Sequence, residues 1–167
     1  MRIADVAVAS THLPLAESFP VSYESNDRTD HVFVRLTTAD GTVGYGEGTT
    51  LPWFTGEVAA GAAAVVERYL APTLEGASLA EAARAHESFL DAFPGAAAAK
   101  AAVDLALVDL RGKRAGVPAH ELLGARVTDE VPVTWVLPAV DPATAAARAR
   151  ERAAAGFRSF KVKADGD

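Results

Sequence analysis

The sequence contains no cysteine. Disulfide bridges, zinc–thiolate sites and a cysteine nucleophile are therefore excluded. No apolar run approaches the ~20 residues that a membrane span needs. The first residues, Met1–Asp5, also lack the apolar core of a signal peptide. We therefore expect a cytoplasmic protein that does not enter a membrane.

Positive charge is also scarce. The formal net charge is −6 at pH 7, and no segment gathers Lys and Arg into a basic stripe. We therefore expect neither nucleic acid nor an anionic membrane as a partner. Half of the residues are apolar (50%) and 23% are charged, which is the composition of a globular protein.

Several common catalytic signatures are missing as well. The sequence has no Walker Gly-Lys-Ser/Thr motif and no Gly-x-Ser-x-Gly elbow, and its 4 histidines do not have the spacing of metal ligands. These absences disfavour a serine hydrolase and a zinc enzyme. The segment Gly41–Gly48 is rich in glycine, but its glycines lie in and after a predicted hairpin. A phosphate loop instead leads from a strand directly into a helix.

Residues 1–127 predict an α+β domain that begins with a three-stranded antiparallel sheet. Ile3–Thr11 alternates weakly and predicts the first strand. His31–Thr38 is rich in β-branched and aromatic residues and predicts the second. Asp40-Gly41 follows and predicts a tight turn into a third strand. Glycine suits this turn because it tolerates the positive φ that the turn requires.

Two loops and a set of helices complete this domain. Residues 13–30, with Pro14 and Pro20, predict a long loop, and loops of this length often form lids or binding loops. A second loop is predicted over 47–56. Near its end, Thr55 is a candidate cap for the next helix. The predicted helices are 57–70, ended by Pro72; 78–93, with a Ser78/Glu81 capping box; 96–115; and a short helix from Pro118 to Leu123.

Residues 128–167 predict the start of a barrel of alternating strands and helices. Val131–Leu137 is a nearly continuous apolar strand, and a helix over 143–155 joins it to a second predicted buried strand, Phe157–Val162. Such strands are typical of a parallel sheet that is buried on both faces. One strand–helix–strand unit cannot bury its own strands, so they require either more of a barrel or another chain. We expect a homo-oligomer.

The pair Lys161-x-Lys163 lies at the end of the last predicted strand. Strand alternation puts both lysines on one face, ~7 Å apart. In βα barrels the carboxyl ends of the strands carry the active site. Neighbouring ammonium groups repel each other, so one of them can release its proton near neutral pH and act as a general base. On spacing alone, two solvated lysines at a fraying chain end explain the pair equally well.

The chain resembles the N-terminal portion of the enolase superfamily, in its mandelate racemase/muconate lactonizing enzyme family. The segment 40–47 is similar to the hairpin of that family's capping domain, and 101–124 to its last capping helix and the link to the barrel. Lys161-Val162-Lys163 matches the Lys-x-Lys motif on the second barrel strand. The resemblance is to the muconate cycloisomerase and dipeptide epimerase type.

This resemblance implies an isomerase or lyase. Family members remove or deliver a proton α to a carboxylate, with Mg²⁺ stabilising an enediolate intermediate. It implies that Lys163 is the acid/base and that Lys161 assists it. The substrate is a small-molecule carboxylate, enclosed by two capping loops at 15–29 and 49–55. The implied substrate contacts in these loops are Phe19, Tyr23, Trp53, Phe54 and Thr55.

The sequence departs from the family pattern in two ways. Val136 stands where several relatives carry a Thr on the first barrel strand, and Thr134, on the same strand face, is the remaining candidate for that substrate contact. The family's acidic metal ligands and its second base lie on later barrel strands, and no residue here matches them. We therefore predict no metal ligand in this chain and no activity of the chain alone.

Two alternatives stay open at this point. Cycloisomerases, dipeptide epimerases and o-succinylbenzoate synthases share the Lys-x-Lys motif, and the segment 51–57 favours the first two. The chain can also be interpreted as a non-catalytic capping-domain remnant, which would act as a binding or oligomerisation module through its exposed barrel strands.

Overall fold

The computed structural model describes residues 1–21 and 24–163, except the side chains of residues 19–26. The chain divides into two compact units. The first contains Met1–Leu13 and Thr29–Arg126, and the second contains Pro14–Arg28 and Val127–Asp167. Each unit is described by itself.

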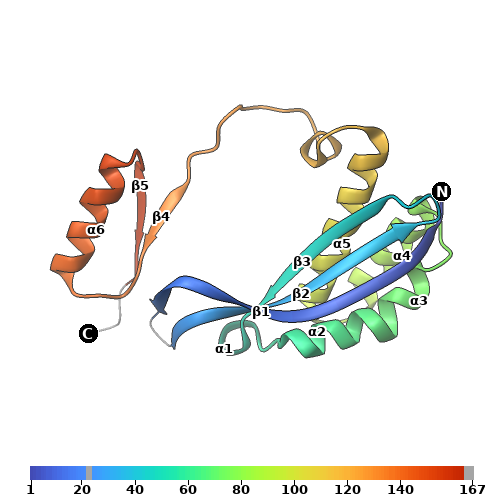
Figure 1. The fold of residues 1–167 in the computed structure, drawn as a ribbon, viewed down its shortest axis with the longest axis horizontal. Helices are drawn as coiled ribbons and strands as arrows, with labels where there is room; N and C mark the ends of the chain where they lie inside the picture. The colour runs from blue at the N-terminus through green and yellow to red at the C-terminus, as the bar shows by residue number, and fades with distance from the viewer. Residues whose placement is uncertain (22–23, 164–167) are drawn as a thin grey trace. The chain divides into compact units, whose positions relative to one another are not determined.

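The first unit is built on a three-stranded sheet in the order β1-β2-β3 (Figure 1). The strands are β1 (Ile3–Val21), β2 (Glu24–Thr38) and β3 (Val43–Thr50). β2 and β3 are antiparallel and pair from Thr37↔Val43 to Asp30↔Thr50. Gly41 turns the chain between them with a φ of 84°. The predicted hairpin and the three-stranded antiparallel sheet are confirmed.

The prediction of a loop over residues 13–30 is wrong, because β1 continues to Val21 and β2 already begins at Glu24. Apolar residues recur at Leu13, Leu15 and Phe19, which is the period of a strand. Pro14 and Pro20 obscured that pattern. β1 is an edge strand, where a proline does not interrupt a ladder on its free side.

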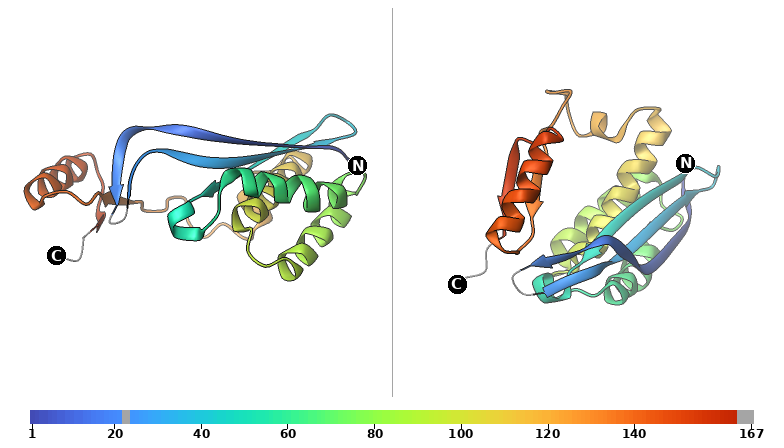
Figure 2. Two further views of the ribbon diagram at one scale, coloured as in Figure 1. Left: turned by 90° about the horizontal axis from the view of Figure 1, so that it is seen from below. Right: turned by 60° about the vertical axis from the view of Figure 1, so that its left-hand side comes forward.

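Helices cover one face of the sheet (Figure 2). The core between the two layers contains Val32, Val34 and Leu36 of β2, and Leu107 and Leu110 of the last long helix. The elements after β3 are α1 (Pro52–Thr55), α2 (Ala59–Val65), the π-helix η1 (Val66–Leu70), α3 (Ala71–Leu74), α4 (Leu79–Ala92), α5 (Ala97–Ala115) and the 3₁₀ helix η2 (Ala119–Leu122).

The capping box at the start of α4 is confirmed. The backbone N–H of Glu81 donates to the Ser78 hydroxyl (3.3 Å), and the backbone N–H of Ser78 donates to the Glu81 carboxylate (2.8 Å). These hydrogen bonds satisfy donors that a helix N-terminus otherwise leaves free. They also hold the pKa of Glu81 below its ordinary value.

Pro72 does not end the first long helix, contrary to the prediction. Helical structure continues through it as α3 and stops at Leu74. The π-helix Val66–Leu70 lies immediately before it. A proline removes one backbone donor and clashes with the preceding turn of an α-helix. The wider π-turn accommodates both effects, so Leu70 and Leu74 stay in the core.

The second unit contains a strand–helix–strand segment. β4 (Thr134–Leu137) and β5 (Ser159–Val162) are parallel, and α6 (Pro142–Ala154) connects them. This is the arrangement predicted for the start of a barrel. The strands are not buried on both faces, however. In β4 only Leu137 is buried, and Val162 in β5 is 63% exposed, because a single helix covers only part of the two-stranded sheet.

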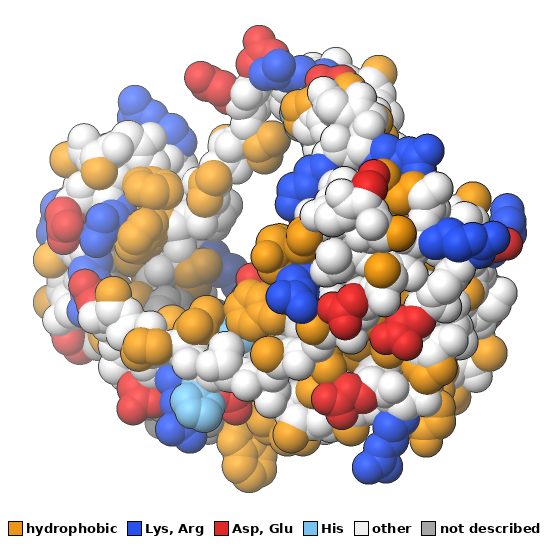
Figure 3. Space-filling view, turned by 45° about the vertical axis from the view of Figure 1, so that its right-hand side comes forward, with side chains coloured by type: hydrophobic (Ala, Val, Ile, Leu, Met, Phe, Trp, Pro, Cys, Tyr) orange, Lys and Arg blue, Asp and Glu red, His pale blue; other side chains and the backbone are white. Residues whose placement is uncertain are grey.

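The described surface is mixed in character. On the face in Figure 3, basic and acidic side chains are interspersed among apolar ones. Within residues 1–21 and 24–163, no helix has both the length and the apolarity to cross a membrane.

Candidate functional site

Lys161 and Lys163 lie at the carboxyl end of the second unit's sheet. Lys161 is in β5 and pairs with Val136 of β4. Lys163 directly follows β5, and its backbone N–H donates to the Leu137 carbonyl (3.1 Å), which continues the parallel ladder. Lys161 is exposed and Lys163 is half-buried. Neither ammonium group has a hydrogen bond or ion pair with any side chain that the structure describes.

The helix α6 packs against the opposite face of these strands. Arg152 of α6 lies over the ring of Trp135 in β4 (4.1 Å to the centroid), and Phe157 packs edge-on against that ring (4.8 Å). Trp135 pairs with Phe160, one position away from Lys161. Because side chains alternate along a strand, Lys161 and Lys163 lie on the face that α6 leaves open.

Thr134, the candidate substrate contact on β4, lies at the amino end of the same open face. It pairs with Ser159, and the two hydroxyl oxygens are 2.9 Å apart. Ser159 precedes Lys163 by four positions, about 13 Å along a strand. The structure therefore brings Thr134 and the lysines onto one face but not to one end of it. Its contact with a substrate stays a prediction.

Trp53 and Phe54 belong to the first unit and are exposed in α1, at 78% and 73%. No side chain of α1 is buried. Two large aromatic side chains as exposed as these suit contact with another surface or with a ligand. Of the two substrate contacts predicted in the segment 15–29, Tyr23 lies outside the described residues. The backbone of Phe19 is in β1, and its side chain is not described.

Thr55 does not cap the following helix as predicted. Its hydroxyl donates to the Leu51 carbonyl within α1 (3.1 Å), and α2 begins later, after Val58. The residue that sequence reasoning missed here is Glu57. Its carboxylate accepts hydrogen bonds from the backbone N–H groups of Ala97 (2.5 Å) and Ala98 (2.9 Å). Glu57 therefore caps α5 from a distant part of the chain and fixes the segment that follows α1.

The described residues do not fit a Mg²⁺ ion. Mg²⁺ prefers several oxygen ligands in octahedral geometry, usually including carboxylates. In the described part of the chain, no group of three or more His, Asp or Glu side chains is placed to hold a metal. Among the side chains that the structure describes, no carboxylate partners the lysine pair either.

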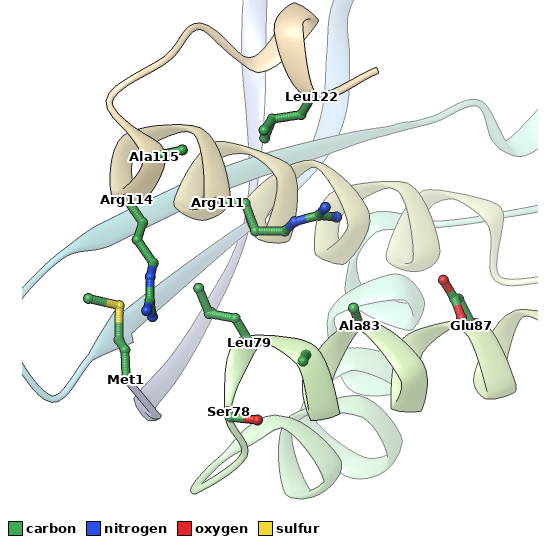
Figure 4. A pocket seen from close by; sticks show the side chains of 10 residues that line it. Met1, Ser78, Leu79, Ala83, Glu87, Arg111, Arg114, Ala115 and Leu122 are labelled. Atoms are coloured by element: carbon green, nitrogen blue, oxygen red, sulfur yellow. The ribbon is translucent and has the colours of Figure 1, made fainter. Parts of the chain in front are cut away.

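A cavity of about 750 Å³ lies between α4 and α5 in the first unit. Figure 4 shows Arg111 and Arg114 extending from α5, with Arg114 directed toward Met1 and Leu79. None of the predicted site residues lines this cavity. It is therefore separate from the candidate chemistry.

Most of the first unit matches a known protein family. Residues 3–124 match the family model described as "Mandelate racemase / muconate lactonizing enzyme, N-terminal domain". The chain belongs to this family. The resemblance drawn from the hairpin, the 101–124 segment and the Lys-x-Lys pair is confirmed.

Relatives in the mandelate racemase/muconate lactonizing enzyme family are isomerases. The chain is 33% identical to the N-succinyl-L-Arg/Lys racemase of Bacillus cereus over 163 residues, which are 98% of this chain and 44% of the racemase. It is 36% identical to muconate cycloisomerase 1 of Rhodococcus opacus over 139 residues, or 82% of this chain and 37% of the relative. The chain thus spans less than half the length of these relatives.

Solved structures of family members have the same fold. The crystal structure of the Bacillus cereus racemase matches with a TM-score of 0.92 and 32% identity, covering 100% of this chain and 45% of the racemase. A dipeptide epimerase of Methylococcus capsulatus, solved in complex with Mg and the dipeptide L-Arg-D-Lys, matches with a TM-score of 0.89 and 34% identity. That match covers 100% of this chain and 47% of the epimerase. The architecture is therefore a capping domain followed by the start of a barrel.

Proposed function

We propose that this chain is the N-terminal part of a Mg²⁺-dependent isomerase or lyase. The enzyme would abstract the proton α to the carboxylate of a small molecule and pass through an enediolate intermediate. The observation that carries the proposal is the position of Lys161 and Lys163. Both lie at the carboxyl end of a barrel-type strand, on the face that α6 leaves open. This is the end at which βα barrels perform their chemistry.

In this proposal Lys163 is the acid/base and Lys161 assists it. Lys163 is half-buried and Lys161 is exposed, so Lys163 is the better enclosed of the two. An unprotonated Lys163 takes the α-proton, and its ammonium form returns a proton. Lys161, on the same face, supplies positive charge for the substrate carboxylate.

The proposed substrate is a small carboxylate of the kind that the relatives act on. These relatives are named as an N-succinyl-L-Arg/Lys racemase, a hydrophobic dipeptide epimerase and a muconate cycloisomerase. We favour epimerisation or cycloisomerisation. Trp53 and Phe54 would cover the apolar part of the substrate, with Thr55, Thr134, Phe19 and Tyr23 as further contacts.

The proposal assigns the Mg²⁺ ligands to residues outside this chain. Bound Mg²⁺ would stabilise the negative charge that develops on the substrate carboxylate. Because the described residues form no such site, we expect the chain of 167 residues to be inactive alone.

The test compares this chain with the whole protein that its gene encodes. Both are incubated with Mg²⁺ and a panel of N-succinyl amino acids, dipeptides and cis,cis-muconate. Epimerisation is followed by polarimetry and lactone formation by absorbance. We expect turnover of at least one substrate by the whole protein, and none by the 167-residue chain.

Two variants identify the residues responsible. Lys163→Ala should lower kcat of the whole protein by at least about a hundredfold. Arg158→Ala removes another exposed cationic side chain just before β5 and serves as the control, with unchanged kcat. Full activity of Lys163→Ala, or Lys163-dependent turnover by the chain alone, would contradict the proposal. A defined oligomer without any turnover would favour a non-catalytic module.

A further inference from the structure

A cluster of polar side chains lies at one end of the β2–β3 ladder. It consists of Thr29 and His31 on β2, with Glu47 and Thr49 on β3, and we call it the root cluster. The ladder ends at the pair Asp30↔Thr50. Beyond this pair β1 and β2 continue without β3, as Figure 1 shows. The root cluster therefore lies where the long hairpin leaves the three-stranded sheet.

His31 is the centre of this cluster and is largely buried, with 9% of its side chain exposed. Its Nδ1 is 2.5 Å from Glu47 Oε1 and 3.3 Å from Thr49 Oγ1. Its Nε2 is 2.6 Å from the Thr29 hydroxyl. The ring also stacks on Phe33, with centroids 6.0 Å apart. Every polar atom of the imidazole thus has a partner, and its orientation is fixed.

The roles of the two ring nitrogens follow from their partners. An ionised carboxylate only accepts hydrogen bonds, so Nδ1–H donates to Glu47. The Thr29 hydroxyl can donate to a neutral Nε2, or rotate and accept from a protonated one. The bridge from Glu47 through His31 to Thr29 therefore persists in either protonation state of the ring.

Each end of this bridge adjoins one of the two capping segments. Thr29 is the first residue after the hairpin segment Pro14–Arg28. Thr49 is near the end of β3, directly before the segment with α1 and its exposed aromatic residues. Glu47 and Thr49 are exposed, but the His31 ring is buried. A buried polar ring costs free energy unless its nitrogens are paired, and once paired it favours a single geometry. The root cluster meets this condition at the base of both segments.

We propose that His31 is a positioning residue that anchors the bases of both capping segments. It acts through Thr29 on the hairpin and through Glu47 and Thr49 on the segment that carries Trp53 and Phe54. It does not touch the substrate. The inference rests on the proposed function in so far as these segments enclose a substrate.

Hydrogen–deuterium exchange of the whole gene product tests the anchoring without any activity. His31→Ala should speed exchange on the order of tenfold in 24–30 and 49–56, because Thr29, Glu47 and Thr49 lose the buried ring that links them. Exchange in 34–37 and 43–46 should stay as it is. His31→Gln, whose amide both donates and accepts, should restore much of the protection.

Two further variants give the test its direction. Thr29→Val removes only the Nε2 partner, so faster exchange should be confined to 24–30. Arg35→Ala breaks an exposed ion pair with Asp5 on the same sheet (3.2 Å) and serves as the control, with neither segment affected. Unchanged exchange in His31→Ala, or an equal increase over the whole sheet, would overturn the anchoring role.

Kinetics of the whole protein test the consequence for the reaction. His31→Ala should raise KM on the order of tenfold and change kcat less, since the lysines remain in place. Wild-type KM combined with loosened segments would overturn the positioning role. A wild-type protein without turnover would refute the proposed function instead, and the exchange result would still decide whether His31 anchors the two segments.

Discussion

Glycines determine how closely β3 approaches α5. A Cβ atom at Gly46 would lie 1.9 Å from the Ala102 carbonyl oxygen, and one at Gly48 would lie 2.1 Å from that of Ala98. No side chain fits at these distances. The glycine-rich segment that was unsuited to a phosphate loop is thus a contact surface between a strand and a helix. The spacing of the glycines excluded a phosphate loop. It did not indicate the close contact with α5, because the partner helix is about 50 residues away in the chain.

Gly46→Ala should therefore lower the free energy of unfolding by about 3 kcal/mol, because the strand and helix backbones must separate. Gly61→Ala in α2 is the matched control. A Cβ there meets nothing closer than 3.4 Å, so the same change should raise stability by about 0.5–1 kcal/mol. Guanidinium unfolding measures both. Equal stabilities of the two variants would refute this account of the packing.

His86 makes stability dependent on pH. It is 2% exposed in α4, and neither ring nitrogen has a hydrogen-bond partner among the described residues. Burial lowers the pKa of His86 below its ordinary value of 6.5. The Asp104 carboxylate opposes that shift, and the Lys100 ammonium adds to it. The folded state therefore holds His86 neutral where the unfolded chain already binds a proton.

We expect the free energy of unfolding to fall as pH drops below about 6.5, because protons bind preferentially to the unfolded state. The loss should level off once the lowered pKa of the folded state is passed. His86→Leu should flatten the profile between pH 7 and 5, relative to wild type. Urea unfolding at each pH measures this free energy. If it changes with pH equally in the two proteins over this range, the prediction is contradicted.

Glu57 shows how an element can depend on a distant residue. The residue that precedes α5, Ala96, has a φ of 55° and offers no side-chain cap. The Glu57 carboxylate supplies the cap and places a negative charge at the positive end of the helix dipole. It thereby joins the segment after α1 to the helix that lies behind β3.

Glu57→Gln should lower the unfolding free energy by about 1 kcal/mol, the usual effect of losing a good cap. Glu67→Gln is the control. It removes the same charge from an exposed residue of η1 and should change little. Thermal unfolding of both variants measures the difference. A larger loss for Glu67→Gln than for Glu57→Gln would contradict the capping role.

Local elements were predictable where their determinants are close in sequence. The Ser78/Glu81 box spans three positions, and the Asp40-Gly41 turn is set by adjacent residues, so both were found. The extension of β1 and the passage of the helix through Pro72 were missed. Prolines are tolerated in β1 because it is an edge strand, and Pro72 is tolerated because a π-turn precedes it. Neither feature can be read from the order of residues. Caps such as Glu57 need the tertiary structure.

For the molecule as a whole, order and spacing of motifs identified the family and fold. The open face of β4–β5 was predictable, since one strand–helix–strand unit cannot bury its own strands. The exposed α1 was not, since its exposure depends on what packs against it. The common face of Lys161 and Lys163 was predictable because side chains alternate along a strand, and their catalytic role stays a prediction. His31 was missed because Thr29, Glu47 and Thr49 gather around it only when β2 pairs with β3.

The central claim is that Lys163 exchanges the α-proton of a carboxylate substrate. The most direct measurement is proton NMR of the whole gene product with its substrate and Mg²⁺ in D₂O. The wild-type protein should replace the α-proton by deuterium, and Lys163→Ala should slow this exchange by at least about a hundredfold. Exchange at the wild-type rate in Lys163→Ala would contradict the claim.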